Sequence, residues 1–371
     1  MESESDVFRG IAAVVNFLAN YLHKANFILS YTSVVLNLFH LLILNRKSMK
    51  TTSTNVIMIG IAISDVSTML ITIYKHYHLV DIENPECVSS SSLLKMYMNT
   101  AAWCLQDHSR RCSSWLGVAM ASVRFTIMRK MTDKRYALCS KPRFGWILIV
   151  CVFCTSGLLS AFYQSRFKIV SGRETPLPVS CSEYQDIEHP PEYTVVLSAL
   201  FFIENQIVLR VYLMFDAIVT KFIPSVAFAM LTLFLLRELR KVRESISSSR
   251  GSGRKASGAV QSHNDEKNDL TTRLIIFMTV SFFIAEAPLG LIYLVKVFSN
   301  VDDPVRLFSV DFVIYFTVLL TLNSISHPIF CMFMSSQYRD SIRRLLGVHR
   351  SKLLKPTSAR GGNKTSVVSM H

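Results

Sequence analysis

Residues 55–74 read NVIMIGIAISDVSTMLITIY, a run of twenty residues in which only Asp65 is charged. A helix of about 20 mostly apolar residues is long enough to cross the hydrocarbon core of a bilayer. Six further blocks have the same character: Ala25–Leu44, Met98–Met128, Gly145–Tyr163, Ile207–Leu236, Leu274–Val295 and Leu307–Met334. Seven such blocks with polar connections predict an all-α membrane protein, a bundle of seven transmembrane helices.

The distribution of charge predicts how this bundle is oriented. The 371 residues carry a net charge of +14, and 26 of the 40 Lys and Arg residues lie in the connections after the first, third, fifth and seventh blocks. The segments on the other side hold only 9 of them. Because basic connections stay in the cytoplasm, we expect a multi-pass plasma membrane protein with an extracellular N-terminus and a cytoplasmic C-terminus. The basic side favours anionic membrane lipid, not nucleic acid.

The polar segments divide the chain around the bundle. Residues 1–24 are predicted to be a short extracellular N-terminus, and its acidic start predicts a signal anchor without cleavage. Residues 25–334 form the seven-helix domain, with a flexible third cytoplasmic loop rich in Ser and Gly at about 244–268. Residues 335–347 are predicted to form an amphipathic helix on the inner membrane surface. The tail, 348–371, is predicted to be disordered.

Polar side chains inside the blocks predict a functional cluster. At a rise of about 1.5 Å per residue, Asn37, Asp65, Ser113, Asn323 and Ser324 all fall about 12–17 Å from the cytoplasmic edge. Ionisable groups within a membrane span are costly and mark candidate functional sites. The cluster is either a hydrated cation site, with sodium as the candidate ion, or a hydrogen-bond network that joins helices.

Several motifs resemble those of the rhodopsin-like G-protein-coupled receptors. They are Ile61–Asp65 in the second block, Arg124 within Ser122–Phe125, Trp146, Pro224, Pro288 in Phe282–Pro288, and His327–Cys331 in place of Asn-Pro-x-x-Tyr. Three longer stretches, Ser53–Asp65, Arg110–Val118 and Met334–Arg339, resemble the nematode serpentine receptors of class W. That class is similar to receptors for FMRFamide-like and myosuppressin-like neuropeptides.

This resemblance implies a receptor that transmits the binding of an extracellular ligand to a heterotrimeric G protein. It implies no enzymatic activity and no cofactor. The ligand is expected to be an FMRFamide-like neuropeptide or a chemosensory small molecule. The alternative is a transporter or channel, which would show internal repeats and discontinuous helices; no repeat between the two halves is evident.

The sequence departs from the family pattern at several positions that the resemblance marks as important. Val123 replaces the acidic residue before Arg124, and Glu286 replaces the Trp two residues before Pro288. His327 and Cys331 replace the Asn and Tyr of the last helix. The residues assigned to switching and G-protein coupling are Arg124, Pro288, His327 and Pro328. For Arg124 the candidate partners are Glu266 and Asp269, or a lipid phosphate.

Charged residues in the outer half of the blocks predict a ligand pocket. Arg110 lies about 21 Å outward from Arg124, and Glu286 about 20 Å outward from the start of its helix. We therefore predict an Arg110–Glu286 ion pair at the pocket floor, because either charge alone would be very costly there. Arg111 has Asp216 as an alternative partner. The other candidate ligand-facing residues are Gln106, Asp107, Lys221, Tyr293 and Tyr315.

The outer loops predict a disulfide between Cys87 and Cys181, with Cys104 as the alternative partner of Cys181. On the inner side, phosphorylation of Ser and Thr in flexible chain would add negative charge and recruit an arrestin. The candidate positions are Ser247, Ser249, Thr357, Ser358, Thr365, Ser366 and Ser369.

Overall fold

The computed structural model describes residues 2–80, 93–129, 136–171, 193–250, 279–295, 297–298, 304–334 and 336–347. The elements in chain order are α1 (Glu2–Leu44), α2 (Ser53–Val80), α3 (Leu93–Arg129), η1 (Tyr136–Ser140), α4 (Pro142–Gln164), β1 (Phe167–Ser171), β2 (Tyr193–Leu197), α5 (Ala199–Phe215), η3 (Asp216–Phe222), α6 (Ile223–Arg250), α8 (Pro304–Met334) and α9 (Ser336–Leu345). A further helix, Thr279–Val295, lies between α6 and α8.

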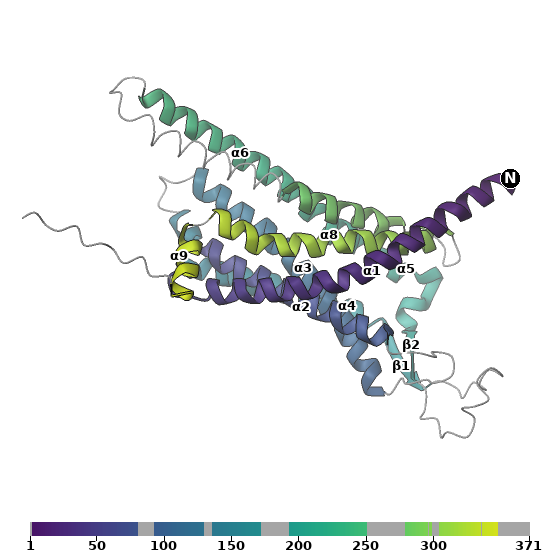
Figure 1. Ribbon diagram of the computed structural model, residues 1–371. Helices are drawn as coiled ribbons and strands as arrows, with labels where there is room; N and C mark the ends of the chain where they lie inside the picture. The colour runs from purple at the N-terminus through teal and green to yellow at the C-terminus, as the bar shows by residue number, and fades with distance from the viewer. Residues whose placement is uncertain are drawn as a thin grey trace, which may run out of the picture.

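The helices lie side by side in an elongated bundle (Figure 1). Five are long and apolar enough to cross a membrane: Ala13–Leu44, Ser53–Tyr77, Pro142–Gln164, Gln206–Glu238 and Asp311–Phe333. The remaining two of the seven predicted spans are α3, which is long but charged, and the shorter apolar helix 279–295. The predicted all-α membrane fold is confirmed.

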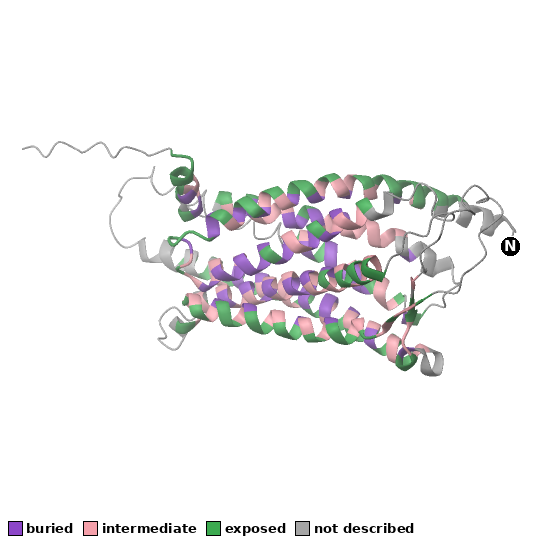
Figure 2. Ribbon diagram, turned by 90° about the horizontal axis from the view of Figure 1, so that it is seen from below, coloured by how far each residue is buried: buried purple, intermediate pink, exposed green. Residues whose placement is uncertain are grey.

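The interior of the bundle is apolar where α2, α3 and α4 meet. Val56, Ile57 and Leu116 are fully buried there. Gly145 allows α4 to lie close to the start of α2, since a Cβ atom at this position would lie 2.7 Å from the Ser53 carbonyl oxygen. Buried residues gather inside the bundle and exposed ones on its outer faces (Figure 2), and many exposed side chains are large and hydrophobic, as a lipid-facing surface requires.

Three features differ from the helices that the sequence predicts. α1 begins at Glu2, so most of the predicted N-terminal segment is helical. An antiparallel hairpin pairs Phe167 of β1 with Leu197 of β2 at the end of α4. The fifth span contains a π-helical segment, η3, between α5 and α6.

α9 lies across one end of the bundle (Figure 1), in the stretch predicted to be an amphipathic helix.

Candidate functional site

The outer pocket lies between α3, η3, helix 279–295 and α8. It offers about 20 Å³ of space to water-sized molecules. Six of the predicted ligand-facing residues line it together with Thr220, Leu289 and Val313; the six are Asp107, Arg110, Arg111, Asp216, Lys221 and Tyr293. Three of the six, Asp107, Arg110 and Arg111, share one face of α3, because i, i+3 and i+4 positions of a helix lie together.

Three predicted pocket residues lie elsewhere. Gln106 faces α2, where its side-chain nitrogen donates to the Thr72 hydroxyl at 3.0 Å. Tyr315 faces α1 and donates to the Val15 carbonyl oxygen at 3.0 Å. Glu286 lies in a deeper cavity on the inner side of Arg110. The direction of each side chain depends on the rotation of its helix about the helix axis. The depth of a residue along the helix does not indicate that direction.

The predicted Arg110–Glu286 ion pair is wrong. Glu286 Oε2 instead lies 3.2 Å from the Lys221 ammonium, and Oε1 accepts a 2.9 Å hydrogen bond from Ser114. Ser114 is one helical turn inward from Arg110, so Glu286 lies a turn deeper than the sequence estimate. The π-helical turn of η3 directs Lys221 into the bundle, where it is 7% exposed and Glu286 is 3% exposed. The alternative pairing, Arg111 with Asp216, is present at 3.7 Å.

Arg110 has no counterion among the described residues. Its side chain makes no hydrogen bond or ion pair with them, and its Nε atom is buried without a partner. Arg110 lines both the outer pocket and the deeper cavity. A guanidinium group thus lies at the junction of the two spaces.

The deeper cavity brings together four of the five residues of the predicted polar cluster, Asp65, Ser113, Asn323 and Ser324. The Ser113 hydroxyl donates to Asp65 Oδ1 at 2.8 Å, and Asn323 accepts a bond from Ser281 at 3.3 Å. The cavity offers about 40 Å³ to water-sized molecules, enough for ordered water.

His327 gives this cluster a partner that the sequence did not identify. Its Nδ1 atom lies 3.5 Å from Asp65 Oδ2. Ser324 is held from α1, by Asn37 at 3.1 Å and Ser33 at 2.9 Å. The network therefore joins α1, α2, α3 and α8. It offers carboxylate, amide and hydroxyl oxygens to a hard cation, but a protonated His327 would compete with that cation.

The inner end contains Arg124, which is only partly accessible. No carboxylate among the described residues lies within ion-pair distance of it, and the candidates Glu266 and Asp269 fall outside the described ranges. Val123 packs into the apolar core between α2, α3 and α4. It therefore supplies no polar contact to the neighbouring Arg124. Pro288 and Pro328 both lie inside helices, where a missing N–H group weakens the backbone ladder and favours bending.

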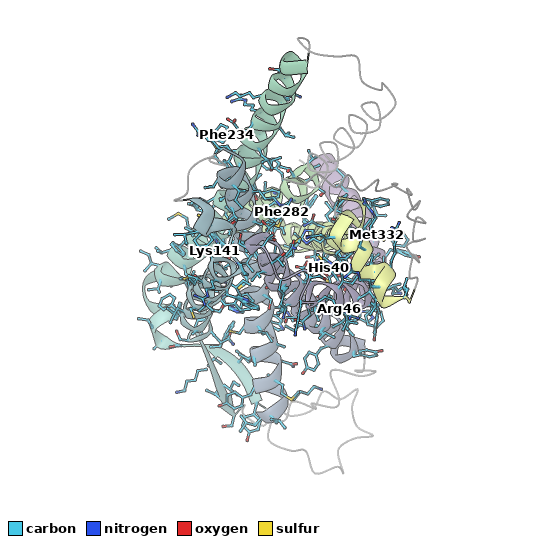
Figure 3. All side chains as sticks on the ribbon, turned by 90° about the vertical axis from the view of Figure 1, so that its left-hand side faces the viewer. His40, Arg46, Lys141, Phe234, Phe282 and Met332 are labelled. Carbon is cyan, nitrogen blue, oxygen red and sulfur yellow. The ribbon has the colours of Figure 1, made fainter. Side chains whose placement is uncertain are left out.

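Figure 3 views the bundle from the end where α9 lies, and Phe282 of helix 279–295 lies near its middle. His40 lies close to α9 in this view, and its Nδ1 atom is 2.8 Å from the Tyr338 hydroxyl. The sequence did not indicate this contact. The sequence features that could have indicated it are a histidine in the otherwise apolar first block and a tyrosine in the amphipathic helix after the last block.

The predicted Cys87–Cys181 disulfide involves two residues outside the described part of the chain. The alternative partner, Cys104, has a free thiol. That thiol donates to the Ser160 carbonyl oxygen of α4 at 3.8 Å. The candidate phosphorylation sites of the tail also lie outside the described residues.

The family model of the serpentine type 7TM GPCR chemoreceptor Srw matches residues 24–349. A search of curated proteins returns no match. The matched region contains α1 from residue 24 onward, all later helices, the outer pocket and the Asp65 cluster. It also contains the three stretches in which the sequence resembles class W receptors. The chain belongs to the serpentine type 7TM GPCR chemoreceptor Srw family.

Proposed function

We propose that the protein binds an extracellular ligand in the outer pocket and thereby activates a heterotrimeric G protein at the end where Arg124 lies. The observation that carries this proposal is the position of the Lys221–Glu286 ion pair. It joins η3 to helix 279–295 directly beside the pocket. A ligand that changes this contact would favour one helix arrangement over another, and its effect is bounded by its differential affinity for the two.

We propose a neuropeptide as the ligand, on the basis of the resemblance to FMRFamide-like peptide receptors. A chemosensory small molecule is the second candidate, and the description of the family as chemoreceptors favours it. Membership of a receptor family also argues against the transporter or channel alternative and against an enzyme.

The remaining predictions complete this proposal. The N-terminus is extracellular, and the basic inner face contacts anionic lipid. Sodium binds beside Asp65, where a protonated His327 would oppose it. Cys87 and Cys181 form the outer disulfide, and phosphorylated Ser and Thr of the tail recruit an arrestin.

The test is a screen of amidated neuropeptides and small odorants on cells that express the receptor, with G-protein dissociation as the signal. With an active ligand in hand, Arg124→Ala should abolish the signal while ligand binding is retained. Arg129→Ala is the matched control, because Arg129 lies in the last turn of the same helix and is exposed. Full coupling by a well-expressed Arg124→Ala receptor would refute the role of Arg124.

A further inference from the structure

The described charges around the outer pocket do not balance. The described cations there are Lys75, Arg110, Arg111, Arg166 and Lys221, and the described anions are Asp107, Asp216 and Glu286. Asp216 forms an ion pair with Arg111, and Glu286 forms an ion pair with Lys221. Asp107 is left to face Lys75, Arg110 and Arg166, so the described residues leave an excess of positive charge beside the pocket.

Lys75 is fixed in place by polar and aromatic contacts. Its ammonium group donates to Gln106 Oε1 at 2.5 Å and lies 4.6 Å from the centre of the Trp103 ring. Both contacts keep its charge near the pocket. Lys75 and Arg110 are close enough for their positive charges to repel each other, and Asp107 attracts Lys75.

Arg110 is the cation that is available to a ligand. It makes no ion pair with Asp107, although both line the outer pocket from the same helix. Its guanidinium borders two cavities, and its Nε–H group is buried without an acceptor among the described residues. A guanidinium offers several donors in a planar fork that matches a carboxylate. An unsatisfied buried donor of this kind is costly until an acceptor arrives.

We infer that the ligand of this receptor carries a carboxylate, and that Arg110 binds this group between the outer pocket and the deeper cavity. The inference rests on the proposed function, in which the outer pocket is the ligand site. In an amidated neuropeptide the carboxylate would belong to an Asp or Glu side chain, because the C-terminus is an amide. A carboxylate offers two acceptor oxygens to the guanidinium fork and neutralises its charge. Asp107 and Asp216 line the same pocket and would repel a doubly charged phosphate more strongly than a singly charged carboxylate.

The experiment uses the purified full-length receptor in detergent and measures its thermal unfolding midpoint. The probes are matched pairs that differ only in the acid group: benzoate against benzamide, phenylacetate against phenylacetamide, and tripeptides with free against amidated C-termini. Inorganic phosphate is a further probe. A ligand that binds the folded state raises the midpoint in proportion to its saturation. The tripeptides and the small acids distinguish a peptide source of the carboxylate from a small organic acid.

We expect at least one carboxylate to raise the midpoint at millimolar to tens of millimolar concentration, and its amide partner to have no effect. Arg110→Gln should weaken carboxylate binding by about tenfold to a hundredfold, because it removes a charge-assisted hydrogen bond. Lys168→Gln is the control, since Lys168 is an exposed cation of β1 on the same side of the membrane. It should leave carboxylate binding unchanged.

A second measurement uses the same variant without a probe. Removing a partly buried cation that has no ion pair among the described residues should leave the midpoint of Arg110→Gln equal to or above that of the wild type. The inference is overturned if amides or phosphate bind as well as carboxylates, if no carboxylate binds, or if Arg110→Gln binds carboxylates like the wild type. A variant that fails to fold would also overturn it, because Arg110 would then have a structural partner. None of these readings involves a G protein, so a failure of coupling would be seen separately.

Discussion

At the scale of single residues, the contact with the greatest influence is the buried ion pair between Lys221 and Glu286. Ser114 supplies a third partner, so the carboxylate is bound from α3 as well as from η3. Burial makes such a pair a weak source of net stability, because both groups lose their hydration. The same burial makes it very sensitive to the loss of one partner. Glu286 stands where the family pattern expects a Trp. Its partner Lys221 therefore limits which residues can occupy that position.

Glu286→Ala should destabilise the receptor by about 3–5 kcal/mol, because Lys221 would remain buried without a counterion. The double variant Lys221→Met, Glu286→Leu should recover most of this loss, since apolar replacement of a buried pair is often neutral. Thermal unfolding of purified protein and surface expression both report the difference.

The control for this prediction is Glu238→Ala, which removes one partner of an exposed pair with Lys241 and should cost no more than about 1 kcal/mol. The charge exchange Arg110→Glu with Glu286→Arg should not restore expression, because these two residues are not paired. Recovery by that exchange would contradict the Lys221–Glu286 assignment.

At the scale of elements, η3 and α9 are joined to the bundle by specific contacts: η3 through two ion pairs and α9 through one buried tyrosine. η3 is a π-helical segment of 7 residues in the middle of the fifth span. It allows Asp216 to meet Arg111 and Lys221 to meet Glu286 from one stretch of chain. π-Helical turns of this kind are frequent at functional sites. α9 is held through Tyr338, which is 2% exposed and packs against α1.

Deletion of Val219 should convert η3 to α-helix and rotate the two halves of the span by about 100° relative to each other. Both ion pairs then cannot form together, so we expect a loss of thermal stability similar to that of Glu286→Ala. Ile218→Ala keeps the chain length and alters an exposed side chain, and it should have little effect. An unchanged unfolding midpoint for the deletion would show that the π-helical turn has no such role.

Tyr338→Phe should destabilise the docking of α9 by about 0.5–1.5 kcal/mol, because His40 loses its hydrogen-bond partner. Burial raises the pKa of the Tyr338 hydroxyl, with a smaller contribution from Cys331, so the hydroxyl stays protonated at neutral pH. Tyr338→Ala should cost more, about 3–5 kcal/mol, because it also leaves a cavity. Unfolding midpoints of the two variants should fall in that order, and Leu346→Ala, an exposed position, should match the wild type.

At the scale of the whole molecule, the distribution of basic residues governs how the bundle lies in the membrane. The connections predicted to be cytoplasmic hold 26 of the 40 Lys and Arg residues. α9 contributes Arg339, Arg343 and Arg344 to the same side, around an apolar face that contains Ile342. Such a helix lies on a membrane surface rich in anionic lipid. In the predicted orientation, the outer pocket and Arg124 lie toward opposite sides of the membrane.

This orientation can be measured with epitope tags on intact cells. A tag before Met1 should be stained without permeabilisation, and a tag after His371 only with it. The control is a tag within residues 251–262 of the third cytoplasmic loop, which should behave like the C-terminal tag. Staining of the C-terminal tag on intact cells would contradict the predicted orientation.

The sequence by itself determined the number of spans and the depth of their polar residues. Membrane insertion depends on local composition, and depth follows from a constant rise per residue, so Asp65, Ser113, Asn323 and Ser324 could be predicted to meet. Only the tertiary structure decided which charges pair. Each residue turns a helix by about 100°, so the π-helical turn and the rotation of helix 279–295 pair Glu286 with Lys221 and leave Arg110 without an ion pair among the described residues. The hairpin β1–β2 and the His40–Tyr338 bond likewise depend on how distant segments pack, which local composition does not encode.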